Sequence, residues 1–122
     1  MKYLILMQVD PDVLAALTEE QMTEIGDGHQ RFIAAITESG EMLSTNALGD
    51  PSQSTVVRGR DGVPEVVDGP FAESKEFMGG YYLVDVESKE RAVELATQIP
   101  DARIPGLALE VRPVMYSAGA DM

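Results

Sequence analysis

The sequence predicts a single α+β domain in which two helices alternate with short strands. Three observations support this fold class. Apolar residues switch between a period of two and helical spacing along the chain, and turn residues separate these segments. The chain has 122 residues and a hydrophobic content of 44%, which suffices for one core. We expect one domain over residues 1–116 and a frayed tail over 117–122.

The first predicted strand, Tyr3–Val9, is apolar on both of its faces. One alternating set contains Tyr3, Ile5, Met7 and Val9, and the other contains Leu4 and Leu6. A strand of this kind is expected to be covered on both faces of its sheet. The residues that follow, Asp10-Pro11-Asp12, predict a turn.

A long helix is predicted from Thr18 to Ser39, because Thr18 and Gln21 have capping-box spacing and Gly40 is a typical stop. Gly26 and Gly28 each cost about 1 kcal/mol inside a helix. They predict a break or kink, with Asp27 capping a second segment. The inward stripe consists of Met22, Ile25, His29, Phe32, Ile33 and Ile36.

The middle of the chain predicts strands. Residues 41–48 form one strand, and 54–60 with 63–67 form a hairpin around Asp61-Gly62. The strand over 77–86 is again apolar on both faces, and Gly79-Gly80 inside it predicts a bulge or a close approach.

The end of the chain predicts a helix and a last strand. Ser88 caps a helix over 89–98 that Pro100 stops, and the last strand covers 107–115. The residues of this helix segment that we expect to face inward are Ala92, Val93, Ala96 and Ile99.

Without the hairpin, the order of elements is βαββαβ, which is the ferredoxin-like pattern. Two helices can cover only one face of such a sheet, whereas its strands are apolar on both faces. We therefore predict a homodimer in which two sheets face each other across a shared interior.

The net charge of −12 argues against a nucleic-acid or anionic-lipid partner, because such partners require clustered basic residues and the nine Lys and Arg are scattered. There is no Cys, no long apolar stretch and no signal-peptide core, so we expect a cytoplasmic protein. No phosphate loop, dinucleotide fingerprint or metal-ligand spacing is present, so we expect neither a cofactor nor a metal site.

The stretch DGPFAESKE, from Asp68 to Glu76, is the most distinctive motif. Together with Gly79-Gly80-Tyr81-Tyr82 and Glu110–Val114, it resembles the YCII-related family, in particular its DGPF branch, although Ser74 replaces the usual Thr. The resemblance implies a dimeric α+β barrel of ferredoxin-like protomers. It also implies a regulatory setting beside extracytoplasmic-function sigma factors.

The same resemblance places His29 at the position of a helix histidine that another YCII branch pairs with an aspartate. Imidazole titrates near neutral pH, so His29 is a candidate general acid or base, oriented by Asp50 or Asp68. The alternative is a core histidine held by one hydrogen bond.

The charged half of the motif is a candidate rim for a ligand cavity, or simply a solvated cluster. The candidate catalytic residues are His29 and Asp68, and the candidate ligand-binding residues are Asp50, Glu73, Lys75, Glu76, Tyr81 and Arg112. Tyr82 is a further possible lining residue. Asp68, Gly69 and Pro70 also have a structural interpretation as a turn, with Phe71 filling the core or the dimer interface. Two functions remain open at this point: a small-molecule-binding protein with acid–base activity, and a non-enzymatic module that binds a protein partner such as a sigma factor.

Overall fold

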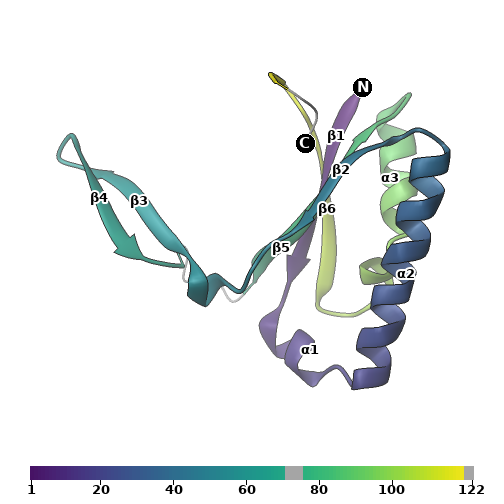
Figure 1. Ribbon diagram of the computed structural model, residues 1–122, viewed down its shortest axis with the longest axis horizontal. Coiled ribbons are helices and arrows are strands. Elements are labelled where there is room, and N and C mark those ends of the chain that lie inside the picture. Colours follow the sequence, from purple (N-terminus) through teal and green to yellow (C-terminus); the bar gives the residue numbers. More distant parts are fainter. Residues whose placement is uncertain (71–75, 120–122) are drawn as a thin grey trace.

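The computed structural model describes residues 1–70 and 76–119, and its centre is a four-stranded antiparallel sheet. The strands are β1 (Lys2–Val9), β2 (Met42–Ala47), β5 (Phe77–Asp85) and β6 (Leu107–Pro113), in the order β2-β5-β1-β6. Helices α2 (Glu19–Glu38) and α3 (Lys89–Thr97) cover one face of this sheet and leave the other face open (Figure 1). The predicted ferredoxin-like α+β fold is confirmed.

Helix α2 is continuous, so the break that we expected near Gly26 and Gly28, with Asp27 capping a second segment, is wrong. Its predicted start is confirmed, because the Gln21 amide donates to Thr18 Oγ1 at 3.1 Å and Gln21 Oε1 accepts from the Thr18 amide at 2.8 Å. The helix is followed by Gly40 with a φ of 79°. Two glycines in a helix of 20 residues therefore reduce its intrinsic propensity without breaking it.

The turn predicted at Asp10–Asp12 is instead the start of a short helix, α1 (Pro11–Ala16). Asp10 Oδ1 accepts from the Asp12 amide at 3.0 Å, and Pro11 occupies the first turn, where its missing N–H costs nothing. The same residues that favour a turn thus favour a helix N-terminus. None of the helices in the described ranges is long and apolar enough to cross a membrane.

The core lies between the two helices and the sheet. Its buried residues are Tyr3, Ile5, Phe32, Ile36, Tyr82, Val84, Val86, Ala92, Leu95, Ala96 and Ile99. The inward positions predicted for Ala92, Ala96 and Ile99 are confirmed, but Val93 is 43% exposed and Leu95 is buried. The reason is helical spacing: Leu95 lies three residues after Ala92, whereas Val93 is rotated away by one position.

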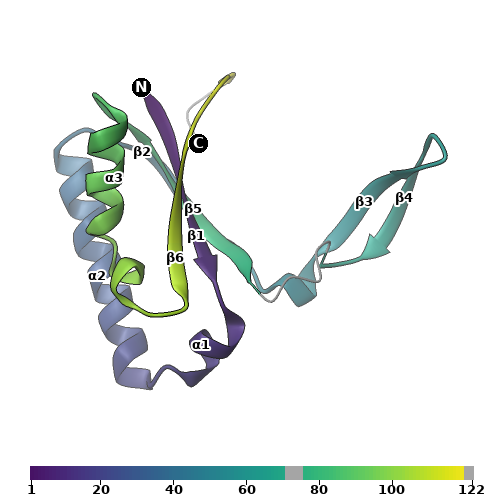
Figure 2. The ribbon, with the colours of Figure 1, turned by 180° about the vertical axis from the view of Figure 1, so that it is seen from behind.

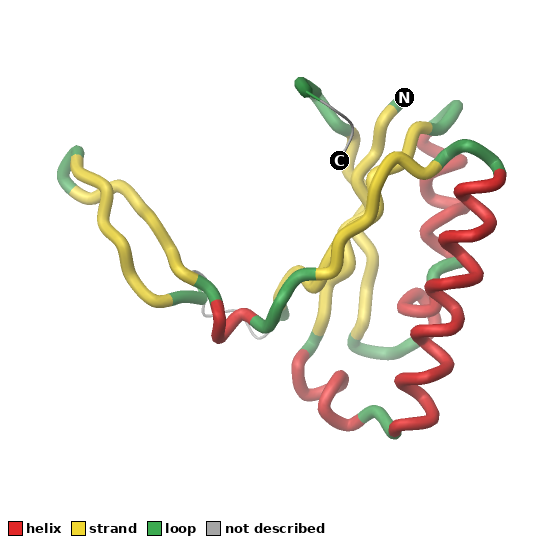
Figure 3. The backbone as a smooth tube through the Cα atoms, viewed as in Figure 1, coloured by secondary structure: helices red, strands yellow, loops and turns green. Residues whose placement is uncertain are grey.

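The predicted hairpin is confirmed as β3 (Thr55–Arg60) and β4 (Val63–Asp68), which form a sheet of their own. Asp61 and Gly62 both have positive φ, at 53° and 79°, as a two-residue hairpin turn requires. Figures 2 and 3 show that this hairpin stands apart from the domain, on the side of the four-stranded sheet that faces away from the helices. We call it the arm.

The bulge predicted at Gly79-Gly80 is also confirmed. The register of β1 with β5 shifts between Met7, which pairs with Gly80, and Gln8, which pairs with Met78. A Cβ atom on Gly80 would lie 2.6 Å from the carbonyl oxygen of Asn46. Glycine is thus required here because the neighbouring strand approaches too closely for any side chain.

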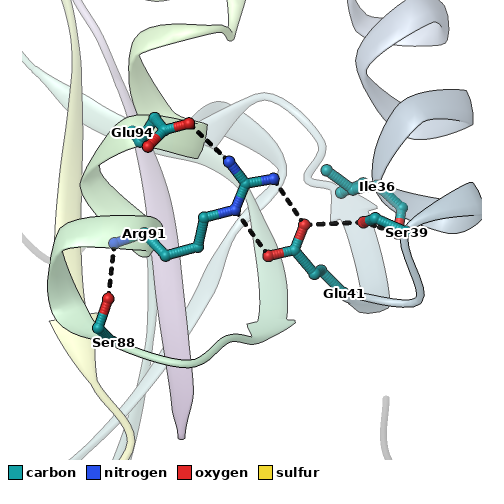
Figure 4. Close-up of polar contacts among 6 residues, drawn as sticks. All are labelled: Ile36, Ser39, Glu41, Ser88, Arg91 and Glu94. Carbon is teal, nitrogen blue, oxygen red and sulfur yellow. Dashed lines mark hydrogen bonds and ion pairs between the residues drawn. The ribbon is translucent and has the colours of Figure 1, made fainter.

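An ion-pair network joins α3 to the segment between α2 and β2 (Figure 4). The Arg91 guanidinium donates to both carboxylate oxygens of Glu41, each at 2.9 Å, and to Glu94 at 2.7 Å. Ser39 Oγ donates to the same Glu41 carboxylate at 2.8 Å. The hydrogen bonds from Arg91 hold the pKa of Glu41 below its ordinary value of 4.5, against the opposing effect of burial.

This network should make the acid stability of the protein depend on Glu41. Because its pKa is lowered in the folded state, the ionised carboxylate stabilises the fold above pH 4.5, and this contribution is lost as the pH falls through the lowered value. We expect Glu41→Gln to lower the melting temperature at pH 7 and to flatten its decline below pH 4.5. Thermal unfolding monitored by circular dichroism from pH 7 to pH 3 measures both effects.

Glu38→Gln is the matched control, since Glu38 is an exposed glutamate at the end of α2. The melting temperature of this variant should decline at acid pH as that of the wild type does. An equal flattening in both variants would show that the Glu41 network is not the source of the acid dependence.

Candidate functional site

The only histidine of the chain is held at both ring nitrogens. His29 Nε2 lies 2.8 Å from Asp101 Oδ1, and His29 Nδ1 lies 2.6 Å from the Tyr82 hydroxyl oxygen. A carboxylate only accepts hydrogen bonds, so Nε2 carries a proton. In the neutral imidazole Nδ1 is then an acceptor, and the Tyr82 hydroxyl donates to it.

Three different elements supply these side chains. Helical spacing places His29 three residues before the buried Phe32 on α2, and strand alternation places Tyr82 on the face of β5 that the helices cover. Asp101 belongs to the 3₁₀ helix η2 (Pro100–Arg103), which follows α3. The site therefore forms only when α2, the sheet and the end of α3 pack together.

Aromatic contacts fix the orientation of the two rings. The His29 ring is parallel to that of Tyr82, with an interplanar angle of 8° and a centroid separation of 5.9 Å. Phe32 packs edge-on against the Tyr82 ring, with a centroid separation of 5.0 Å and an interplanar angle of 82°. Tyr82 thus lies in the hydrophobic core, and only its hydroxyl reaches the polar site.

The site is largely shielded from water. The side chain of His29 is 19% exposed, that of Asp101 is 8% exposed, and Tyr82 is 2% exposed. Burial, followed by the nearby charge of Asp101, raises the pKa of Tyr82 to about 12. The phenol consequently stays protonated at neutral pH, and His29 is the most exposed of the three side chains.

Gly28 explains how Asp101 comes so close to α2. A Cβ atom on Gly28 would lie 2.4 Å from Cγ of Pro100, so η2 packs directly on the backbone of α2 at this residue. Gly28 precedes His29, and Pro100 precedes Asp101. The glycine that weakens the helix is therefore the residue that allows His29 and Asp101 to meet.

The partner of His29 differs from the sequence-based expectation. We expected Asp50 or Asp68 to orient it, whereas the carboxylate at hydrogen-bond distance is that of Asp101. Asp68 is an exposed residue at the base of the arm, opposite Thr55. Asp50 caps the 3₁₀ helix η1 (Pro51–Gln53), where the amide of Ser52 donates to it at 2.9 Å and lowers its pKa.

The other candidate residues fall in two further places. Asp50 and Glu76 line a cleft of about 1130 Å³ at the base of the arm. Tyr81 and Arg112 lie on the open face of the sheet, where the Tyr81 hydroxyl accepts from Asn46 Nδ2 at 2.7 Å. The structure therefore does not bring these four residues to His29. Phe71, Glu73 and Lys75 lie outside the described residues.

Sequence reasoning missed Asp101 entirely. The residue follows a proline in a short turn, and acidic residues in such positions are usually exposed. The available signal was Gly28 in α2, because a glycine inside a helix can mark the close approach of another element. That signal indicates where a contact lies but does not identify the residue that makes it.

Fold and site together define a small ferredoxin-like α+β protein with a shielded His–carboxylate–phenol centre. The family model of the YCII-related domain, which describes its sequence pattern, matches residues 1–116, and the chain belongs to this family. An uncharacterized protein of Rhizobium meliloti (strain 1021) is 29% identical over 124 residues, which cover 98% of this chain and 97% of that protein.

The two glycines of α2 give a matched pair of tests for this geometry. In Gly28→Ala the new methyl group collides with Pro100, and overpacking of this kind costs about 1–3 kcal/mol in the free energy of unfolding. A Cβ at Gly26 meets nothing within 4 Å, so Gly26→Ala should instead stabilise the protein by about 1 kcal/mol. Urea unfolding of the two variants measures both changes. Equal effects of the two substitutions would contradict the close packing of α2 on η2.

Proposed function

We propose that this YCII-related protein binds a small molecule and transfers a proton to or from it at His29. The observation that carries the proposal is the imidazole fixed between the Asp101 carboxylate and the Tyr82 phenol. Histidine paired with a carboxylate is the usual arrangement of a general base in proteins, because the carboxylate fixes the tautomer and stabilises the imidazolium.

The centre can exist in two protonation states without losing a hydrogen bond. In the neutral state the Tyr82 hydroxyl donates to Nδ1 of His29. When Nδ1 gains a proton, the same hydroxyl can accept from it, because a phenol both donates and accepts. Asp101 accepts from Nε2 in both states. Because both ring nitrogens have partners, proton transfer at Nδ1 requires the Tyr82 hydroxyl to turn away and a ligand to take its place, while Asp101 keeps its hydrogen bond to Nε2.

The shielding of the site supports a small substrate. The exposed part of His29 is limited, and the surroundings are the aromatic rings of Tyr82 and Phe32. His29 lies on the face of the sheet that the helices cover, so a cavity between two open sheet faces would lie on the other side of the sheet from it. We therefore assign proton transfer to the side of the sheet on which α2 and η2 lie.

Imidazole NMR tests the centre directly, because the chain contains a single histidine. When the His29 ring of the wild type is neutral, we expect it to populate the Nε2–H tautomer, with Nδ1 as the acceptor. In Asp101→Asn and Tyr82→Phe this preference should weaken, since each variant removes one of the two partners. The ¹⁵N shifts of the ring nitrogens report the tautomer.

Tyr81→Phe is the matched control, because Tyr81 is the adjacent residue on β5 and lies on the opposite face of the sheet. The ¹⁵N shifts of the His29 ring in this variant should match those in the wild type. A wild-type histidine without a tautomer preference would contradict the hydrogen-bond pattern on which the proposal rests.

A thermal-shift screen tests the function itself. The probes are small carboxylic acids, phenols, sugar phosphates and divalent metal ions, and a compound that binds the folded state raises the melting temperature by mass action. We expect at least one compound to stabilise the wild type and to stabilise His29→Gln much less. If no compound in these classes distinguishes the two proteins, the small-molecule function is wrong.

A second candidate, a protein-binding module, is supported by the arm. Val57, Val63 and Val66 on the arm are 66%, 63% and 67% exposed, and an isolated two-stranded hairpin is only marginally stable. We propose that the arm and the open sheet face, which carries Leu4 and Leu83, pack against a second copy of the chain. In this dimer the arm would gain the apolar partner that it lacks in the isolated chain. A sigma factor, which the sequence motif suggests, is the alternative partner for the same surface.

Size measurement separates these partners. Sedimentation of the purified protein should give a dimer, and Val57→Glu with Val66→Glu should shift it toward the monomer, because the charges would be buried at the interface. Val93→Glu, on the exposed face of α3, is the control and should remain dimeric. If the wild type is a monomer and captures an extracytoplasmic-function sigma factor in a pull-down at low salt, the sigma factor is favoured over a second copy of the chain as the partner.

A further inference from the structure

We infer that a cleft between α2 and η2 is a binding site for a small organic monoanion with an apolar body. The cleft has a volume of about 740 Å³, within the range of small-molecule sites. The residues that line it are Glu24, Ile25, Asp27, Gly28, Arg31, Phe32, Ala35, Gln98, Pro100, Arg103 and Ile104. His29 and Asp101 do not line it, so this site is distinct from the proton-transfer centre and rests on different observations.

The two arginines of the cleft are unlike the other arginines of the described residues. Arg58, Arg60, Arg91 and Arg112 all form ion pairs with glutamates. The side chains of Arg31 and Arg103 have no ion pair or hydrogen bond with any residue in 1–70 or 76–119.

This difference is informative because the chain has 21 acidic residues and only nine basic ones. Carboxylates are thus abundant, yet the two arginines without one lie in the same cleft. Arg31 belongs to α2 and Arg103 to η2, so they approach the cleft from its two walls. Guanidinium groups recognise carboxylates by paired hydrogen bonds, which makes an anionic group the natural occupant.

The rest of the lining narrows the ligand class. Ile25, Pro100 and Ile104 provide an apolar surface between the charged groups, which suits an aromatic or aliphatic body. Glu24 and Asp27 also line the cleft and would repel a second negative charge. The site should therefore prefer a monoanion to a polyanion and to a neutral compound of the same shape.

Backbone NMR with benzoate as the probe tests this inference. At low salt we expect saturable shifts of the amide signals of Gly28, Arg31 and Arg103, with a dissociation constant of roughly 10 mM or tighter for a ligand of this size. Benzamide, which is neutral, and isophthalate, which is a dianion, should bind more weakly. Added salt should weaken the binding of benzoate, because the charges are close to solvent.

Substitutions at the two arginines complete the test. Arg31→Gln and Arg103→Gln should each weaken benzoate binding about tenfold, since each removes charge-assisted hydrogen bonds. Arg58→Gln, on the arm, is the matched control and should bind as the wild type does. The inference is overturned if benzoate causes no saturable shift, or if the three variants bind alike.

The same spectra separate this site from the proposed function. The imidazole signals of His29 are read alongside the amide signals. If benzoate shifts the ring of His29 and its affinity is insensitive to Arg31 and Arg103, the anion binds at the proton-transfer centre and the cleft site is wrong. A different outcome is that benzoate binds at the cleft while every compound of the thermal-shift screen stabilises His29→Gln as much as the wild type. In that case the cleft site is supported and the proton-transfer function is wrong.

Discussion

The contact of Gly28 with Pro100 determines the arrangement of the helical layer. Because Gly28 has no side chain, η2 packs on the backbone of α2. The next residue of each element, His29 after Gly28 and Asp101 after Pro100, then lies beside the other. His29 and Asp101 then meet at 2.8 Å, and Tyr82 closes the group from the sheet. A larger residue at Gly28 would separate α2 from η2 and with it the carboxylate from the imidazole. The helix thus gives up some intrinsic stability in order to position a polar centre in the core.

The domain is divided by its sheet into two sides with different properties. On the helix side lie the core, the histidine centre and the cleft with Arg31 and Arg103. On the other side lie the open sheet face and the arm with its exposed valines. The proposed proton transfer thus belongs to the first side and the proposed association to the second. This division explains why Tyr81 and Tyr82, neighbours in sequence, have such different surroundings: strand alternation places them on opposite faces.

Local patterns were sufficient to predict most of the elements. The capping box at Thr18, the Asp61-Gly62 turn and the bulge at Gly80 each depend on residues close in sequence or on a single backbone constraint, and all three are confirmed. The site was harder, because Asp101 lies 72 residues after His29 and reaches it only through packing of η2. The acidic residues that we expected to orient His29, Asp50 and Asp68, are exposed and lie elsewhere. A motif rich in charged residues is visible in a sequence, whereas the one acidic residue that is buried in the described ranges is not.

Tyr82 links the core to the chemistry of the site. Its ring is held by Phe32 and the sheet, so its hydroxyl has a fixed position, while the raised pKa of about 12 keeps the proton on the oxygen. A phenol that ionised near neutral pH would compete with His29 for the proton and would place a second negative charge close to Asp101. Burial prevents this and keeps the phenol neutral beside the imidazole and the carboxylate. The same burial that stabilises the core therefore also keeps Tyr82 as a neutral hydrogen-bond partner of His29, which the proposed acid–base centre requires.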